Sequence, residues 1–501
     1  MRLGWNLLAG LTNSAWTALI GVLATPFYLH YLGIESYGLI GFFTTLLTLL
    51  QLLDLGLSPT MNREAARHAA VGDLRGVRHL LRSLELVYWA AALLLCAFFV
   101  LAAGLIGRHW LRSTHLASAD VVHALMLMGL VIAVRWPVGL YAGTLMGAQR
   151  LAIVSGISII MVTVGAVGSI VVLATVSPTI QAFFLWQAGI GLLYVFVMRR
   201  AAWMILRGGS GIGFKLNELR RIWRFSAGLG AIAVTGVILM QIDKLLLSRM
   251  VGLGAYGRYM LASLLASGLY LLVTPIFNVL YPRFSALVAG VETEHIAELY
   301  GLATRLVATL VFPVAIAIAL FAEPLVQLWT HDMHLAAQVA PILSLLILGS
   351  ALHGIMYLPY ALQLAYGKAR LALVINMALL AIYLPLIVAL TLIYGEIGAA
   401  LAWLLLHCCY VGLGTWLTHR HFLKGHGSGW LVRDVGIPFF ASLLVGMVVS
   451  KIVYRSSNSG YLALFCACVV VIGSALLSLA LSPALRLSLV ENLSLKLHKS
   501  R

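Results

Sequence analysis

The amino-acid sequence predicts an all-α membrane protein with about 14 transmembrane helices, arranged as two six-helix lobes followed by two further helices. Of the 501 residues, 62% are hydrophobic and only 10% are charged, and the mean hydropathy is +1.01. A soluble chain of this length could not bury so much apolar surface, because too few polar residues would remain to cover it. Two short motifs also recur at one long interval, which indicates that a six-helix unit is duplicated.

The repeated motifs agree on a single period. Gly-x-x-x-Tyr-Gly follows an apolar run at residues 33–38 and again at residues 252–257, an offset of 219 residues. Gly-x-x-Arg-Leu-Ala occurs at residues 147–152 and 367–372, an offset of 220. This interval is too long for a solenoid repeat and fits six membrane helices with their loops. Either pair alone could arise by chance in a sequence rich in Gly, Leu and Ala, but together they favour duplication.

Apolar runs long enough to span a bilayer occur along the whole chain, since about 20 residues are sufficient for a transmembrane helix. Polar residues interrupt the first run, so we predict that it is a retained membrane helix and not a cleaved signal peptide. The predicted helices are residues 6–30, 38–59, 84–107, 121–146, 151–175, 179–199, 225–250, 256–280, 306–329, 337–363, 371–394, 397–418, 434–454 and 460–482.

These runs predict four parts of the chain. They are a six-helix lobe at 1–200, a cytoplasmic interfacial linker at 201–224, a second six-helix lobe at 225–420, and helices 13 and 14 with a cytoplasmic tail at 421–501.

Three stretches between spans have the pattern of amphipathic helices that lie on the cytoplasmic interface. They are residues 64–82, 210–224 and 291–304. Their basic residues either anchor the protein to anionic lipid or draw an anionic head group toward the cytoplasmic side.

Lys and Arg are distributed very unequally between the two sides of the predicted membrane. One side carries 25 of the 33 basic residues and the other carries six. Because basic loops stay in the cytoplasm, this bias predicts a multi-pass plasma-membrane protein with both termini cytoplasmic. The formal charge of +17 is then a topology signal, since the basic residues form no single stripe for nucleic acid.

No motif in the sequence predicts a catalytic centre, a cofactor or a metal. There is no nucleotide-binding Gly-rich loop, no Ser-His-Asp context, no zincin helix and no long loop that could hold a catalytic domain. His331 and His334 lie in a short outer loop without a second pair of ligands. The five cysteines lie in apolar runs and predict neither disulfides nor a zinc site. We therefore expect a carrier and not an enzyme.

Charged residues inside the predicted spans are the main candidates for function, because each costs about 2.5–3.5 kcal/mol near the bilayer centre. We single out Asp54, Arg135, Asp243 and Lys244. Arg135 and Lys244, one in each predicted lobe, are the candidates for binding an anionic head group, since a fixed cation in low dielectric suits a phosphate. For Asp54 and Asp243, a packing or hinge ion pair within one lobe explains the charge equally well.

Neighbouring helix positions point about 100° apart, so Asp243 and Lys244 need not pair with each other. Uncharged polar residues in spans either face the cavity or form interhelical hydrogen bonds worth about 1 kcal/mol. The candidates for cavity or gating positions are Asn13, Gln51, Asp54, Gln241, Asp243, Asn278 and His353.

Several of these segments together resemble a known family. The segments are 31–38, Asp54-Leu55-Gly56-Leu57 with Arg63 following, 143–150, and 241–244 with Gly252 and Tyr256-Gly257. They resemble the polysaccharide-unit flippases of the multidrug/oligosaccharidyl-lipid/polysaccharide exporter superfamily, over helices 1 to 12. The resemblance implies a MATE-like exporter fold, in which two six-helix lobes related by an axis normal to the membrane enclose an alternating-access cavity.

The resemblance also implies a cargo. It is an undecaprenyl-pyrophosphate-linked oligosaccharide, moved from the cytoplasmic to the outer leaflet for O-antigen, capsule or exopolysaccharide synthesis. A polysaccharide polymerase and a chain-length regulator are the implied protein partners.

Two other cargoes remain open for the same fold. A multidrug/cation antiporter would need an acidic cavity, which Asp54 and Asp243 could provide. A lipid II flippase would be expected to group several basic residues in the first lobe, whereas the first helix carries none beyond Arg2. A membrane glycosyltransferase or polymerase would need an extended outer loop with catalytic residues, and the sequence has none.

Overall fold

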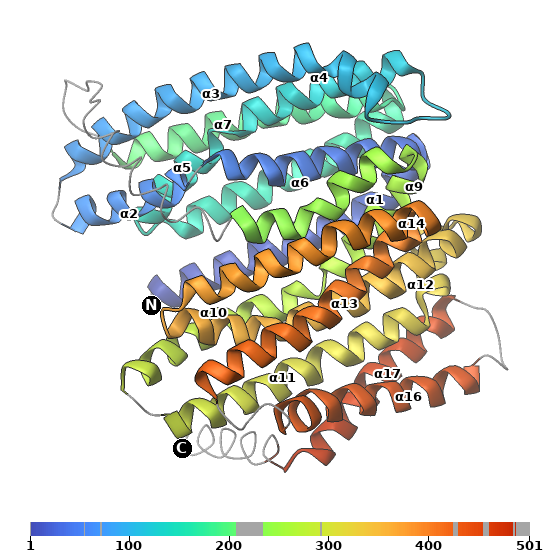
Figure 1. Ribbon diagram of the computed structural model, residues 1–501. Coiled ribbons are helices and arrows are strands. Elements are labelled where there is room, and N and C mark those ends of the chain that lie inside the picture. The colour runs from blue at the N-terminus through green and yellow to red at the C-terminus, as the bar shows by residue number, and fades with distance from the viewer. Residues whose placement is uncertain are drawn as a thin grey trace, which may run out of the picture. The chain divides into compact units, whose positions relative to one another are not determined.

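The computed structural model describes residues 2–54, 56–70, 73–206, 234–290, 293–423, 429–453, 460–483 and 486. Within these ranges the chain is helical almost throughout and has no β-strand beyond an isolated bridge between Arg112 and Gly252. The helices form two compact units, Met1–Gly257 and Arg258–Arg501. Figure 1 shows each unit as long helices packed side by side.

The helices of the first unit follow one another with short connections. In chain order they are α1 (Arg2–Leu50), a 3-10 turn η1 (Gln51–Asp54), α2 (Leu57–Ala70), α3 (Leu74–His109), α4 (Ser118–Arg135), α5 (Val138–Gly147), α6 (Leu151–Thr175), α7 (Ile180–Ile205), the helical residues 234–250 and the start of α9 (Leu253–Ser267).

The second unit begins within α9. Its further helices are α10 (Tyr270–Ala289), α11 (Thr293–Leu320), α12 (Ala322–Thr330), α13 (Met333–Ala365), α14 (Ala369–Phe422), a π-helical segment η2 (Trp430–Gly436), α16 (Ile437–Val453) and α17 (Gly460–Leu481).

The membrane-length helices match the predicted fold class. Among the described residues, eleven helices are long and apolar enough to cross a membrane. Two of these contain a glycine with a left-handed backbone, Gly33 in α1 (φ 75°) and Gly395 in α14 (φ 61°), so each comprises two consecutive segments. Glycine allows this because it has no Cβ. Counted in this way and taken with residues 234–250, the spans correspond to the fourteen predicted, and the all-α membrane class is confirmed.

Two of the predicted helices are interrupted. The helix predicted at 121–146 divides into α4 and α5 at Trp136 and Pro137, where proline lacks the amide hydrogen that a continuous helix needs. The helix predicted at 256–280 divides into α9 and α10 at Gly268 and Leu269. Pro137 is a signal for the first break in the sequence, whereas apolar residues flank the second break on both sides.

The predicted interfacial helix at 64–82 is wrong as a single element. α2 ends at Ala70 and α3 begins at Leu74, where the Asp73 carboxylate accepts a 3.0 Å hydrogen bond from the Gly76 amide as an N-cap. His68 Nδ1 lies 2.9 Å from the same carboxylate. The bond from Gly76, followed by that from His68, lowers the pKa of Asp73 below its ordinary value.

The interfacial helix predicted at 291–304 is also wrong. From Thr293 the chain forms the first turns of α11, which continues without a break into the membrane-length segment. Ile296, Tyr300 and Thr304 on these turns are buried, so this part packs against the protein and does not lie on a lipid surface. The third predicted interfacial helix, 210–224, falls outside the described residues.

The predicted lobe boundary at 201–224 also falls mostly outside the described residues. The boundary between the two compact units lies later, after Gly257, because residues 234–257 pack with the first unit. The four-part division of the chain therefore remains a prediction.

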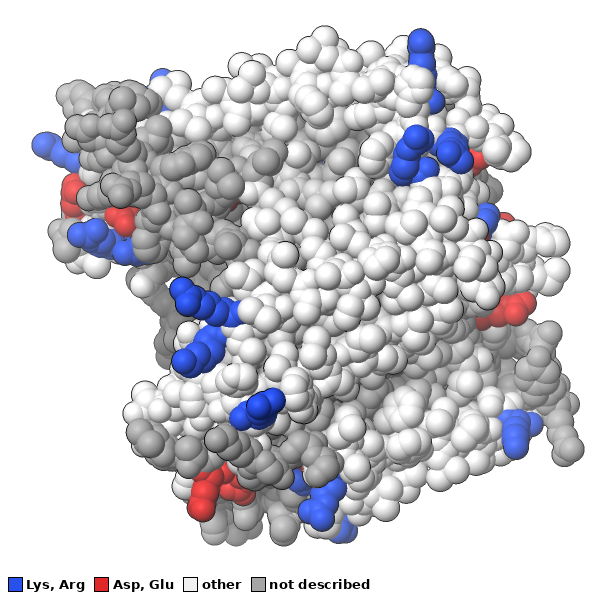
Figure 2. All heavy atoms as spheres, in the orientation of Figure 1, with Lys and Arg blue, Asp and Glu red and all other residues white. Residues whose placement is uncertain are grey.

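The surface fits a protein embedded in lipid. On the face shown in Figure 2, Lys, Arg, Asp and Glu lie mostly toward the left and right edges, and the middle is almost uncharged. Large apolar side chains are exposed on several spans, for example Leu94 and Leu101 on α3 and Leu392 on α14. Such exposure is expected where lipid tails, and not water, cover the helices.

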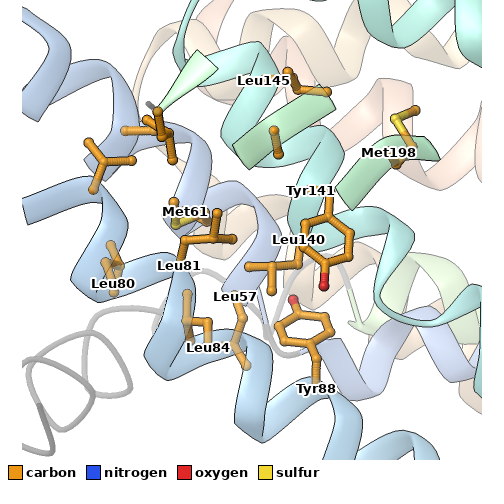
Figure 3. Packing of buried hydrophobic residues seen from close by; sticks show 14 of the residues in the cluster. Leu57, Met61, Leu80, Leu81, Leu84, Tyr88, Leu140, Tyr141, Leu145 and Met198 are labelled. Atoms are coloured by element: carbon orange, nitrogen blue, oxygen red, sulfur yellow. The ribbon is translucent and has the colours of Figure 1, made fainter. Parts of the chain in front are cut away.

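One hydrophobic core cluster of the first unit lies mainly between α2, α3, α5 and α7 (Figure 3). Met61, Leu81 and Tyr141 are among its fully buried side chains. α5 approaches α2 closely through Gly143 and Gly147, and a Cβ added at Gly143 would lie only 2.6 Å from the Ser58 carbonyl oxygen. This small-x-x-x-small spacing brings helix backbones together without the aid of a hydrophobic effect, and it explains the glycines of the 143–150 segment.

The two Gly-x-x-x-Tyr-Gly motifs pack against each other within the first unit. A Cβ added at Gly38 would lie 2.5 Å from the carbonyl oxygen of Leu253, and one added at Gly257 would overlap the carbonyl oxygen of Ile34. Gly38 ends the first motif and Leu253 follows the first glycine of the second, while Gly257 and Ile34 hold the matching positions. The contact is therefore reciprocal, as expected for a duplicated unit whose copies are related by a pseudo-two-fold axis.

Candidate functional site

Arg135 is the last residue of α4 and lies among apolar side chains. Its Nη2 donates a 2.5 Å hydrogen bond to Oε1 of Gln187 on α7. Gln187 Nε2 donates in turn to Oγ of Ser169 on α6 at 3.0 Å, and Ser169 donates to the Gly165 carbonyl at 2.8 Å. A chain of neutral groups thus fixes the guanidinium between three helices.

The charge of Arg135 is not matched by an acid. Its Nε is buried without a hydrogen-bond partner, and no Asp or Glu forms an ion pair with it in the described part of the chain. Gly191 on α7 makes room for the side chain, since a Cβ there would lie 3.3 Å from Arg135 Cγ. A cation held in this way is costly unless an anion joins it.

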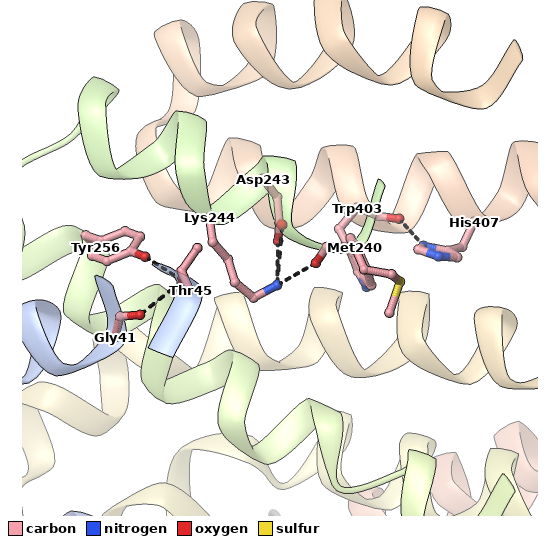
Figure 4. Close-up of polar contacts among 8 residues, drawn as sticks. All are labelled: Gly41, Thr45, Met240, Asp243, Lys244, Tyr256, Trp403 and His407. Atoms are coloured by element: carbon pink, nitrogen blue, oxygen red, sulfur yellow. Dashed lines mark hydrogen bonds and ion pairs between the residues drawn. The ribbon is translucent and has the colours of Figure 1, made fainter. Parts of the chain in front are cut away.

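Lys244 and Asp243 form an ion pair on the helical residues 234–250 (Figure 4). Lys244 Nζ lies 3.2 Å from Asp243 Oδ2 and also donates to the Met240 carbonyl at 3.1 Å. The side chain of Asp243 is 2% exposed and that of Lys244 is 16% exposed. The long lysine chain folds back toward its neighbour, so the pair as a whole is neutral, unlike Arg135.

Gln241 and Asn13 complete the polar candidates in the spans of the first unit. Gln241 is partly buried on the same helix as Asp243, and it makes no hydrogen bond to another described residue. The Oδ1 atom of Asn13 in α1 is buried and likewise finds no partner among the described residues.

Asp54 has a local structural role. It ends η1, and its carboxylate accepts hydrogen bonds from the Ser58 amide (3.0 Å) and the Ser58 hydroxyl (3.1 Å), and also from the Tyr88 hydroxyl. It therefore caps the first turn of α2 and ties it to α3. The expectation that Asp54 lies well inside a helix at 38–59 is wrong, because the helix ends before it. Gln51, at the start of η1, is exposed.

In the second unit, His353 on α13 lies in a cluster of rings. Its Nδ1 is 2.9 Å from the Tyr270 hydroxyl on α10, and its ring centroid is 4.9 Å from that of His407 on α14. His407 Nδ1 in turn bonds the Trp403 carbonyl at 2.8 Å (Figure 4). Asn278, on α10, is exposed.

The His331 to His334 stretch forms a turn and a helix cap. His331 adopts a left-handed backbone after α12, and the Asp332 side chain accepts a 2.9 Å hydrogen bond from the Leu335 amide at the start of α13. Within the described ranges, no group of three or more His, Cys, Asp or Glu side chains is placed to hold a metal ion.

Two further buried carboxylates, Glu85 and Glu35, were not predicted from the sequence. Glu85 on α3 accepts hydrogen bonds from Tyr141 (2.6 Å), Arg199 (2.5 Å) and Arg82 (2.9 Å). Its position just inside the apolar run at 84–107 was the available signal. Glu35 accepts bonds from the loop after α3, including the amides of residues 114–116, and no signal in the sequence links it to that loop.

The long kinked helices form a polytopic membrane fold, and solved structures share this fold. The chain superimposes on the lipid II flippase MurJ in an inward closed conformation with a TM-score of 0.73 at 13% identity, covering 95% of this chain and 98% of that one. A multidrug resistance MATE family transporter of the MOP superfamily, in an inward-facing conformation, gives 0.62 at 14% identity, covering 85% and 99%. The predicted MATE-like exporter fold is confirmed.

The chain belongs to the polysaccharide biosynthesis protein family, whose model matches residues 4–288. It is also 21% identical over 403 residues to a putative O-antigen transporter from Shigella flexneri, covering 78% of this chain and 93% of the relative.

Proposed function

We propose that this protein moves a lipid-linked oligosaccharide across the plasma membrane for the assembly of a surface polysaccharide. Its family and its likeness to a putative O-antigen transporter support this role. The proposed cargo is an undecaprenyl-pyrophosphate-linked oligosaccharide, carried from the cytoplasmic to the outer leaflet by alternating access between two lobes. In this proposal both termini are cytoplasmic, and a polymerase and a chain-length regulator act on the exported unit.

The main structural support for the proposal is the environment of Arg135. This residue is a cation among membrane-length helices whose only described hydrogen bond is to a neutral amide, and its Nε has no partner there. A pyrophosphate would supply the missing negative charge and could accept two parallel hydrogen bonds from the guanidinium. A membrane potential that is negative inside also favours outward movement of an anion, by roughly 2.3 kcal/mol per charge per 100 mV.

Lys244 has a secondary role in this proposal. Its ammonium already has Asp243 as a counter-ion, so a phosphate would have to compete with a carboxylate that is fixed nearby. We therefore expect Lys244 to contribute less to cargo binding than Arg135. Asp243 then serves to hold Lys244 and its helix and does not select the cargo.

The two rival cargoes predict different charges. An organic cation would favour an unpaired acid, but Asp54 caps α2 and Asp243 is paired with Lys244. Lipid II shares the polyprenyl-pyrophosphate group with the proposed cargo, so Arg135 would serve either lipid. The two lipids differ in their sugar portion. A deletion strain would distinguish them, because its cells would lose the surface polysaccharide if the cargo is the oligosaccharide lipid and would lose viability if it is lipid II.

The experiment replaces Arg135 in a deletion strain and measures surface polysaccharide together with the amount of protein in the membrane. Arg135→Met keeps much of the side-chain length without the charge, and we expect it to lower polysaccharide strongly. Arg135→Lys keeps the charge and should retain more activity. Arg108→Ala, at an exposed position near the end of α3, is the control and should behave like the wild type. Full complementation by Arg135→Met at normal abundance would rule out the cationic site.

A further inference from the structure

The second unit has a row of aromatic side chains where α10 faces α13. The row consists of Tyr270, Phe277 and Tyr281 on α10 and Tyr357 and Tyr360 on α13. Phe277 stacks on Tyr281 (centroids 6.0 Å apart, planes at 7°) and on Tyr360 (6.0 Å, 11°). Tyr270 stacks on Tyr357 (6.1 Å, 30°). Residues seven and eleven positions apart share one face of a helix, so the row is a continuous strip.

The strip is partly exposed along its length, and its Tyr270 end leads toward the interior. All five rings of the row are partly exposed. Beyond Tyr270 it continues into His353, which contacts His407 in the interior. The other end, with Phe277, Tyr281 and Tyr360, is therefore the part that a ligand could touch.

Three of the four tyrosine hydroxyls of the strip have no hydrogen-bond partner among the described residues. The hydroxyls of Tyr281, Tyr357 and Tyr360 make no hydrogen bond to any residue in the described part of the chain. Thr274 and Asn278 are exposed, and together with Tyr281 they follow a spacing of four and three residues along one face of α10. An exposed amide in contact with lipid tails would be costly, so this face is built for a water-filled or ligand-filled space.

The chemistry of the strip restricts its occupant. A polyprenyl chain would need apolar surface and would gain nothing from free hydroxyls and an amide. An organic cation would be expected to meet an acid, but α10 and α13 contain no Asp or Glu. A sugar ring has one apolar face of C–H groups, which packs on aromatic rings, and a rim of hydroxyls, which bind phenols and amides.

We propose that the aromatic row is the surface that binds the sugar portion of the cargo. Resting on the proposed function, this inference assigns the glycan to α10 and α13. Phe277 and Tyr360 supply the stacking surface, and Asn278 and Tyr281 supply hydrogen bonds to the sugar hydroxyls. Because the flat face of a pyranose is common to many sugars, the row recognises sugar rings in general.

The test compares two probes on the purified full-length protein in lipid nanodiscs. One probe is undecaprenyl pyrophosphate bearing an N-acetylhexosamine disaccharide, and the other is the same lipid without sugar. Phe277→Ala and Tyr360→Ala should each raise the Kd for the sugar-bearing lipid by at least about fivefold, as expected for truncation of an aromatic contact residue. Their Kd for the sugar-free lipid should not change. Asn278→Ala, at an exposed position, tests the polar side without risk to folding and should act in the same direction.

Phe440→Ala is the matched control, because Phe440 on α16 is 65% exposed and lies outside the row. Equal weakening of both probes by the alanine variants would assign the row to the lipid chain or to packing and would overturn the inference. So would unchanged binding of the sugar-bearing lipid by all three variants. A wild-type protein that binds neither probe would instead refute the proposed function.

Discussion

The reciprocal glycine contact leads to the sharpest prediction for the fold. Replacing Gly38 by Ala puts a methyl group 2.5 Å from the Leu253 carbonyl oxygen, closer than real Cβ contacts come. The obstructing atom belongs to the backbone, so no side-chain rotation can relieve the overlap. The two helix segments must instead separate by about 0.5 Å, which forfeits roughly a quarter of the dispersion attraction between facing atoms.

The expected cost follows from two opposing effects. Overpacking of a close contact costs about 1–3 kcal/mol, while Ala is better than Gly in a helix by roughly 0.5–1 kcal/mol. We therefore expect Gly38→Ala to lower the free energy of unfolding by about 1–2 kcal/mol. Gly257→Ala strains the same contact from the other side, so the double variant should lose less than the sum of the two single losses.

The assay is reversible unfolding of the purified protein in mixed micelles as SDS increases, followed by tryptophan fluorescence. Gly104→Ala on α3 is the control, because a Cβ at Gly104 would meet no atom within 4 Å, and it should be neutral or stabilising. If Gly38→Ala proved as stable as Gly104→Ala, or if the Gly38 and Gly257 losses simply added, the reciprocal contact would not hold this unit together.

Three further predictions concern single elements. Asp54→Ala removes the cap of α2 and should lower the free energy of unfolding by about 0.5–2 kcal/mol; an unchanged SDS midpoint would show that the cap is dispensable. The lowered pKa of Asp73 means that its bond to Gly76 stabilises the start of α3 above the ordinary Asp pKa and is lost as pH falls through the lowered one. The protection of the Gly76 amide against exchange, relative to its intrinsic rate at each pH, should accordingly fall in acid in the wild type, whereas Asp73→Asn should remove that pH dependence. Reporter fusions after Arg112 and Lys424 should report the outside and the cytoplasm respectively, and reversed signals would overturn the assigned topology.

The length of the apolar runs and the repeated motifs could predict the architecture, because every span must be long and apolar enough to cross the bilayer. The length of apolar runs sets the number of spans, and the motifs at 33–38 and 252–257 kept the residues that the reciprocal contact needs. Breaks inside apolar runs could not be predicted in the same way. Pro137 marks the division between α4 and α5, whereas at the division between α9 and α10 only Ser267-Gly268 interrupts an otherwise apolar run.

The roles of the charged candidates depend on their hydrogen-bond and ion-pair partners, and sequence spacing does not identify these partners. Gln187 lies 52 positions from Arg135, so no helical spacing connects them. Asp243 and Lys244 are adjacent, and their pairing depends on a flexible lysine chain folding back. Asp54 looked buried in a span because the apolar pattern continues to η1, although the helix ends there.

In the proposed function, Arg135 holds the pyrophosphate of a translocated lipid-linked oligosaccharide. The most direct measurement is movement of an undecaprenyl-pyrophosphate-linked disaccharide across proteoliposomes, detected by labelling sugars in the outer leaflet. We expect movement by the wild-type protein, some movement by Arg135→Lys and near-complete loss in Arg135→Met at equal reconstitution. Equal movement by wild type and Arg135→Met would contradict this role of Arg135.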